Sequence, residues 1–160
     1  MTPSVLIAGI GNIFLGDDGF GPEVMRHLPP NLAGPDVRLC DYGIRGVHLA
    51  YDLLDGWGAL ILVDALPSRD RPGTLHVFEA DRDNLSPGSG LDAHAMDPAA
   101  VFASLHALGG TLPYTVVIGC EVATVADGIG LSEPVAAAVP DAVRAVEAAV
   151  ARLSTTVGQG

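Results

Sequence analysis

The amino-acid sequence predicts an α/β protein with three αβα layers, in which helices cover both faces of a mostly parallel, twisted sheet of about five strands. Strand-like and helix-like segments alternate along the whole chain, as in folds built from βαβ units. Several strand-like segments are uninterrupted apolar runs, which is typical of strands buried on both faces. The 160 residues are 49% hydrophobic and contain no linker or repeat, so we expect one domain over residues 1–160.

The first half of the chain contains three predicted strands and two predicted helices. The strands are expected at 5–10, 37–41 and 59–64, and the helices at 22–28 and 46–54. Pro22 suits the first turn of its helix, because an N–H at that position has no partner within the helix.

The second half begins with an alternating segment, 74–79, which predicts a half-exposed strand at an edge of the sheet. A polar loop follows, and Asp97-Pro98 then opens a helix that we expect to end near Leu108. The apolar run 114–119 predicts another buried strand. Ser132 is expected to cap a final helical region, which Pro140 should kink or restart.

Charge excludes several classes of function. The formal net charge is −11, so the protein should repel nucleic acid and anionic membranes. All basic residues are arginine, which excludes Schiff-base chemistry on lysine and lysine-dependent phosphate loops.

The remaining bulk features predict a soluble, cytoplasmic protein. The first residues lack the basic segment of a signal peptide, and no apolar run approaches the length of a membrane helix. Cys40 and Cys120 are far apart and form no C-x-x-C motif, so we expect reduced thiols.

Acidic residues follow two of the predicted strands. Asp17 and Asp18 lie in the glycine-rich loop after the first strand, and Asp64 ends the third. If these strands are neighbours, the carboxylates converge beyond the carboxyl ends of the strands, which is where ligands bind in such sheets, and His94 could join them there. Two carboxylates and an imidazole suit a borderline divalent metal. Each aspartate taken alone is more typical of a turn than of a ligand, and only the three residues together favour a functional site; spacing alone does not establish a metal site.

Nucleotide binding is the weaker interpretation of the same loop. Gly9 and Gly11 begin like a dinucleotide fingerprint, but Phe14 occupies the position of the third glycine. In a phosphate loop, Asp17 would stand where lysine is required, and two adjacent carboxylates would repel a pyrophosphate.

Four segments stand in a recognisable order and spacing along nearly the whole chain: GIGNIFLGDDGFG at 9–21, ILVDA at 61–65, DAH at 92–94 and GLS at 130–132. Through these segments the sequence resembles the hydrogenase maturation proteases. This resemblance implies an αβα fold and an endopeptidase that removes a C-terminal extension from the large-subunit precursor of nickel–iron hydrogenase after nickel insertion.

Carried over by position, the resemblance makes Asp18, Asp64 and His94 both the metal-contacting and the catalytic residues. It implies no permanently bound cofactor, because the nickel belongs to the substrate, and zinc or cadmium could occupy the site as a surrogate. Asp17 would support the site or shape its turn. The precursor is the expected partner, and a monomer is the expected state.

One departure from the family pattern concerns substrate recognition. Many relatives carry Asp-Gly-Gly-Thr-x-Gly after the second strand, where this chain has Asp41-Tyr-Gly43-Ile-Arg45-Gly46. We therefore expect Asp41, Gly43 and Arg45 to influence which precursor is bound. Two alternatives stay open: a related metal-dependent peptidase or amidase on the same scaffold, and a non-catalytic metal-sensing module that docks on the precursor.

Overall fold

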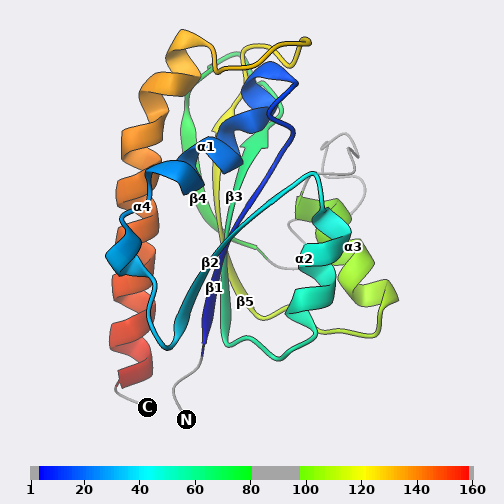
Figure 1. Ribbon diagram of the computed structural model, residues 1–160, viewed down its shortest axis with the longest axis vertical. Helices are drawn as coiled ribbons and strands as arrows, with labels where there is room; N and C mark the ends of the chain where they lie inside the picture. Colours follow the sequence, from blue (N-terminus) through cyan, green and yellow to red (C-terminus); the bar gives the residue numbers. More distant parts are fainter. Residues whose placement is uncertain (1–3, 81–97, 159–160) are drawn as a thin grey trace.

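A computed structural model describes residues 4–80 and 98–158 of the chain as a sheet between two helical layers (Figure 1). The sheet has the order β2-β1-β3-β5-β4, and only β4 runs antiparallel to its neighbour. The strands are β1 (Val5–Ile10), β2 (Val37–Gly43), β3 (Ala59–Leu66), β4 (Leu75–Ala80) and β5 (Tyr114–Glu121). The predicted fold class is therefore confirmed, including the edge position of the strand near residues 74–79.

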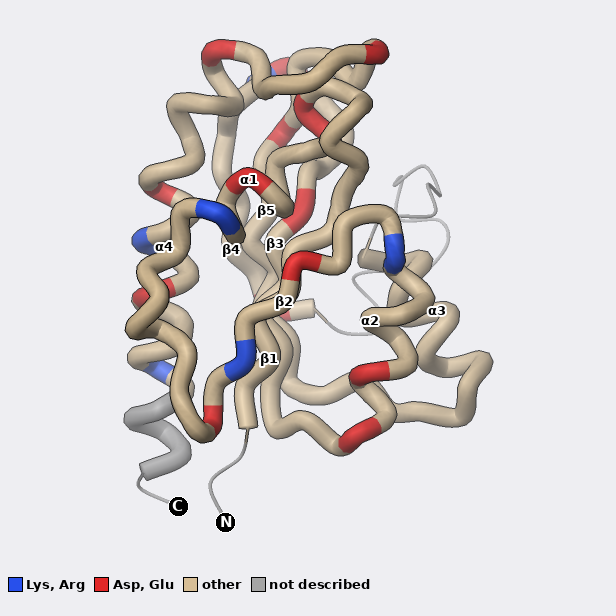
Figure 2. The backbone as a smooth tube through the Cα atoms, viewed as in Figure 1, with Lys and Arg blue, Asp and Glu red and all other residues tan. Residues whose placement is uncertain are grey.

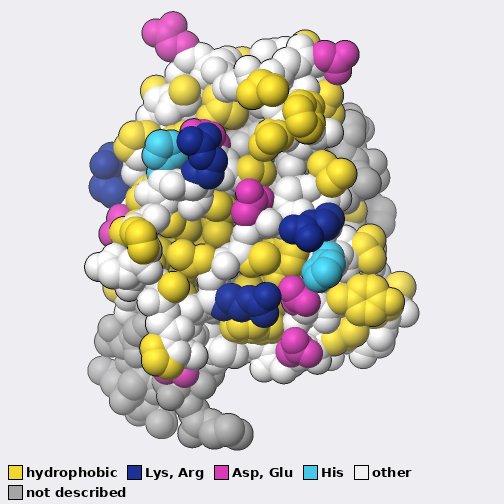
Figure 3. Space-filling model, viewed as in Figure 1, with side chains coloured by type: hydrophobic (Ala, Val, Ile, Leu, Met, Phe, Trp, Pro, Cys, Tyr) yellow, Lys and Arg dark blue, Asp and Glu magenta, His cyan; other side chains and the backbone are white. Residues whose placement is uncertain are grey.

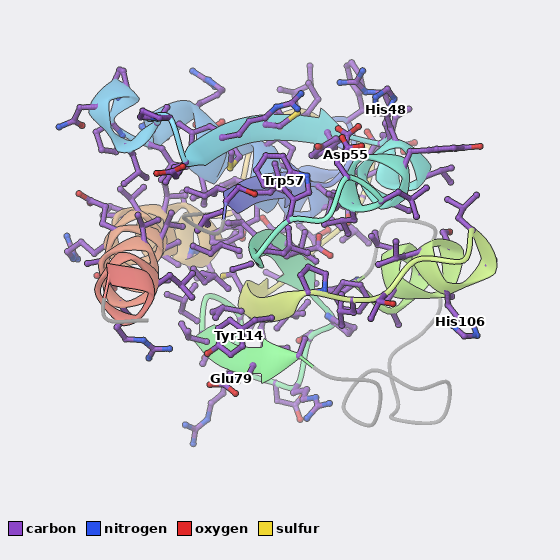
Figure 4. The ribbon with its side chains drawn as sticks, turned by 90° about the horizontal axis from the view of Figure 1, so that it is seen from below. His48, Asp55, Trp57, Glu79, His106 and Tyr114 are labelled. Carbon is purple, nitrogen blue, oxygen red and sulfur yellow. The ribbon has the colours of Figure 1, made fainter. Side chains whose placement is uncertain are left out.

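Four α-helices lie on the two faces of the sheet within the described residues. They are α1 (Phe20–His27), α2 (Gly46–Leu53), α3 (Pro98–Ala107) and α4 (Glu133–Gly158), with short 3-10 helices η1 (Gly16–Gly19) and η2 (Pro30–Leu32). Viewed along the strands, α1 and α4 lie on one side of the sheet and α2 and α3 on the other (Figure 4). The strands supply alternate side chains to two separate cores, as expected for a sheet covered on both faces.

The central strands bring the ends of β1 and β3 together. They pair in parallel from Val5↔Ala59 to Gly9↔Val63, so Asp64 lies beside the end of β1. Gly21, in the first turn of α1, packs against the backbone at this point: a Cβ there would lie 2.6 Å from the carbonyl oxygen of Val63. This close approach positions α1 and the loop before it over the carboxyl ends of the strands.

Helix α4 continues through Pro140 as one element, so the helix does not restart at that proline, and a kink there stays a prediction. The buried Val139, Ala142 and Val146 fix this part of α4 against the sheet, and this packing offsets the missing proline N–H. Among the described residues, neither α4 nor any other helix combines the length and apolarity that crossing a membrane requires.

Candidate functional site

Asp18 and Asp64 lie at the carboxyl end of the sheet. Asp64 is buried, and its Oδ1 accepts a hydrogen bond of 2.8 Å from the backbone N–H of Ala65. Asp18 is half-buried in η1, and its Oδ2 accepts one of 2.8 Å from the N–H of Asn12. Because η1 contacts β3, the turn that carries Asp18 packs against the strand that carries Asp64. β1 and β3 are parallel neighbours in the sheet, which is the condition under which the two carboxylates were expected to converge.

His94, the third residue expected at the site, belongs to the segment 81–97 and lies outside the described residues, as does Asp97. Across residues 4–80 and 98–158, no three histidine, cysteine or acidic side chains cluster so as to hold a metal ion. Two carboxylates supply only part of the ligand set that a borderline metal such as nickel takes from proteins. The roles expected of Asp18, Asp64 and His94 therefore stay predictions.

Asp17, next to Asp18 in the sequence, binds a distant loop. Its fully buried carboxylate accepts hydrogen bonds from the backbone N–H groups of Ala123, Thr124 and Ser132, at 2.8, 3.0 and 2.7 Å. The Ser132 hydroxyl donates a further one of 2.8 Å. Ser132 does precede the final helix as expected, but its hydroxyl binds Asp17. One carboxylate thus attaches the segment 122–132, called here the 122–132 loop, to η1.

Two opposing effects act on the pKa of Asp17. Burial raises this pKa, but the hydrogen bonds from Ser132, Thr124 and Ala123 lower it, and the result lies below the usual value of the group. Asp17 therefore stays ionised at neutral pH, which is the state that accepts all of these hydrogen bonds.

Glu121 plays a similar part at the end of β5. Its buried carboxylate accepts hydrogen bonds from the His76 imidazole Nε2 at 2.8 Å and from the N–H groups of Arg69 and Arg71 at 2.7 and 3.4 Å. The hydrogen bond from His76 lowers the pKa of Glu121, burial opposes it, and the two backbone groups lower it further. The half-exposed imidazole of His76 is thus held against a buried carboxylate.

Of the three residues expected to select the precursor, Asp41 and Gly43 lie at the end of β2, and Arg45 directly precedes α2. Asp41 is exposed, and its Oδ1 accepts a hydrogen bond from the N–H of Gly43 at 2.9 Å. Gly43 has a φ of 55°, and its carbonyl accepts a hydrogen bond from the N–H of Gly11, so the end of β2 contacts the glycine-rich loop after β1 that carries Asp17 and Asp18. Arg45 is exposed, and its Nε donates to the carbonyl of Tyr42 at 3.3 Å. Their role in recognition stays a prediction.

A groove of about 870 Å³ runs between α1 and α4 beside the site. Apolar and small residues from the loops that precede the two helices line part of it: Ile13, Gly16, Gly19, Ile129, Gly130 and Leu131. Gly16 and Gly19 are the two ends of η1, so the groove reaches the turn that carries Asp18. Asp41 also lines the groove, as do Glu23 and Arg26 of α1, which pair at 2.9 Å.

The surroundings of the site are apolar and acidic. On the face drawn in Figure 3, apolar side chains gather over the upper part of the molecule, where the loops before α1 and α4 lie. These loops expose Ile13, Phe14, Val125 and Ile129, the last at 77%. Acidic positions surround the same end of the sheet (Figure 2). Exposed apolar patches of this kind are typical of surfaces that bind proteins.

Comparison with known proteins gives a consistent result. A family model described as hydrogenase maturation protease matches residues 22–149. The coenzyme F420 hydrogenase subunit delta of Methanothermobacter thermautotrophicus is 35% identical over 150 residues, which cover 89% of this chain and 91% of that protein. A putative hydrogenase maturation protease of Methanocaldococcus jannaschii is 36% identical over 147 residues, which cover 89% and 93%.

Solved structures share the fold. The hydrogenase maturating endopeptidase HybD from Escherichia coli superposes with a TM-score of 0.74 at 24% identity, with 93% of each chain covered. A hydrogenase 2 maturation peptidase from a Thaumarchaeota archaeon gives 0.64 at 29% identity, with 92% of this chain and 97% of that chain covered.

Proposed function

Because this chain belongs to the hydrogenase maturation protease family, we propose that it is an endopeptidase that removes the C-terminal extension of a nickel–iron hydrogenase large-subunit precursor after nickel insertion. The observation that carries the proposal is the family match together with the position of Asp18 and Asp64. These carboxylates lie at the carboxyl end of a parallel sheet, which is where enzymes of this architecture bind their ligands. We also propose a cytoplasmic location.

In this account Asp18, Asp64 and His94 bind the nickel that the precursor carries, so the metal enters the site as part of the substrate. Binding through that metal aligns the scissile peptide beside the carboxylates, which lowers the entropic cost of reaching the reactive geometry. A metal-polarised carbonyl or water and a nearby base then permit hydrolysis. Which group acts as the base stays open. Asp41, Gly43 and Arg45 contribute to the choice of precursor.

A non-catalytic docking role is the second candidate, and one observation favours it. A relative at 35% identity carries the name of a hydrogenase subunit and not that of a protease. A docking protein of this kind would bind the precursor and leave its C-terminus intact.

The test is to incubate the purified protein with its cognate precursor, nickel-loaded and nickel-free, and to weigh the products by mass spectrometry. We expect loss of a C-terminal peptide from the nickel-loaded form only. Cleavage of both forms would contradict recognition through nickel and favour a related peptidase. Stable binding of the loaded precursor without cleavage would overturn the protease and favour the docking role.

A further inference from the structure

The 122–132 loop has little structure of its own. It lies between the last residue of β5 and the start of α4 and forms no helix or regular strand. Val125 and Ile129 are exposed, and Leu131 near the end of the loop is only partly buried against a core, so burial contributes little to the position of its middle. The placement of this loop therefore depends on its hydrogen bonds to the segment 14–17.

The hydrogen bonds of the Asp17 carboxylate are central to that placement. Three backbone N–H groups and one hydroxyl, from both ends of the 122–132 loop, converge on this buried side chain. Backbone pairing adds to them: the N–H of Asp17 donates to Thr124, and Gly16 and Phe14 bond to Gly128. The carboxylate fixes both ends of the loop, and the backbone pairing fixes its middle.

The position of the loop matters because it forms a wall of the groove. Ile129, Gly130 and Leu131 line the groove, and so do Gly16 and Gly19, which flank Asp17 and Asp18 in η1. The side chain of Asp18 is turned to a different partner, the N–H of Asn12. The two adjacent aspartates thus have separate tasks: Asp18 belongs to the candidate site, and Asp17 fixes the distance from that site to the groove wall.

We propose that Asp17 is a positioning residue that holds the 122–132 loop as a wall of the α1–α4 groove and thereby sets the affinity for the precursor, not the rate of bond cleavage. This inference rests on the proposed function, since the precursor is taken as the occupant of the groove. Asp17 acts through the loop and does not touch the reacting atoms. Its loss should therefore raise KM and Kd together and change kcat little.

The first test compares Asp17→Asn with Asp127→Asn. The Asp17 substitution places an amide NH2 against several N–H donors, which releases the loop. Asp127→Asn removes the same charge from an exposed position of the same loop, outside the groove lining. For Asp17→Asn we expect KM and the Kd for nickel-loaded precursor to rise about tenfold or more, because hydrogen bonds to a charged group are lost. The kcat should stay within about threefold of the wild-type value, because Asp17 does not touch the reacting atoms. Asp127→Asn should match the wild type.

A second pair of variants covers the case in which Asp17→Asn does not fold. Ser132→Ala removes only the hydroxyl donor to Asp17, and Ser132→Thr keeps a hydroxyl. Ser132→Ala should raise KM and Kd by about threefold to tenfold, and Ser132→Thr should restore them, since a single hydrogen bond to a charged group is at stake. A merely structural role would lower the thermal midpoint without this division between KM and kcat.

The outcomes separate this inference from the proposed function. If folded Asp17→Asn keeps the wild-type KM and Kd, or loses kcat at unchanged KM, the positioning role is overturned while the protease assignment stands. If the wild type binds the precursor without cleaving it, the protease assignment fails, and the Kd values of the variants still decide the positioning role. If the wild type does not bind the precursor, both are overturned.

Discussion

At the scale of single residues, two buried carboxylates attach loops to the end of the sheet. Asp17 binds the 122–132 loop, and Glu121 binds the segment around Arg69 together with His76. Neither role was predictable from local sequence. The partners of Asp17 lie more than a hundred positions away along the chain. A single histidine in a strand, such as His76, does not indicate that Glu121 is its hydrogen-bond partner. The signal that sequence did offer was an acidic residue at the end of a buried strand.

Glu121 should make the stability of the fold depend on acidic pH. Its pKa is lower in the folded protein than its usual value of 4.5, chiefly through His76, so the unfolded chain binds the proton more tightly. The resulting stabilisation is complete above about pH 5 and is lost as the pH falls through and below 4.5. Thermal midpoints measured from pH 7 to pH 3 should therefore fall less steeply for Glu121→Gln than for the wild type.

The matched control is Glu147→Gln, at an exposed position of α4. Its midpoints should run parallel to those of the wild type. Equal slopes for the wild type and Glu121→Gln would show that the Glu121 contacts do not stabilise the fold.

Cys120 should be chemically inert in the native protein. Burial raises its pKa to about 12, and the nearby charges of Asp17 and Glu121 act in the same direction. Since the thiolate is the reactive form, a Cys40→Ser variant should resist alkylation by iodoacetamide at pH 8 until it is unfolded. Mass spectrometry of the treated protein counts the modified thiols. Labelling of the native variant as fast as in denaturant would contradict the burial of Cys120.

At the scale of elements, the order of strands and helices followed from apolar periodicity and turn residues. The uninterrupted runs at 5–10, 59–64 and 114–119 are central strands, because only strands buried on both faces can be apolar throughout. Element ends were less predictable. β3 and β5 each continue two residues further than expected, and α4 passes through Pro140, because tertiary packing overrides the local preference.

The contact between α1 and the central strands depends on Gly21. A Cβ at this position would collide with the carbonyl oxygens of Ile10 and Val63, both backbone atoms that cannot move aside cheaply. Gly21→Ala should therefore lower the free energy of unfolding by about 1–3 kcal/mol, as other overpacked substitutions do. Urea denaturation followed by circular dichroism measures the change.

Gly34→Ala provides the control for this substitution. A Cβ at Gly34 meets no atom within 4 Å, and the residue does not have a positive φ. Its stability should stay within about 0.5 kcal/mol of the wild type. If both alanine variants have the same stability, the close approach at Gly21 has no energetic consequence.

At the scale of the whole molecule, the sheet topology places the chemistry at one end. Because β1 and β3 are parallel neighbours, Asp18 and Asp64 lie at the same end of the sheet although they are far apart in sequence. This part of the site was predictable from the strand order. The groove between α1 and α4 was not, since it arises from the packing of two helices and a loop that have no shared sequence motif. The opposite end carries other exposed groups, including Asp55 and the Tyr114–Glu79 hydrogen bond (Figure 4).

The proposed joint action of Asp18 and Asp64 on a nickel-bearing precursor is tested most directly by the fraction of nickel-loaded precursor that each variant shortens. Asp18→Asn and Asp64→Asn each remove one carboxylate charge from the site, and Asp55→Asn removes one from an exposed position at the other end of the sheet. With intact-mass analysis we expect cleavage to fall by about 100-fold or more in both site variants, as for other losses of catalytic groups, and to be unchanged in Asp55→Asn. Cleavage at the wild-type level by folded Asp18→Asn or Asp64→Asn would contradict this joint action.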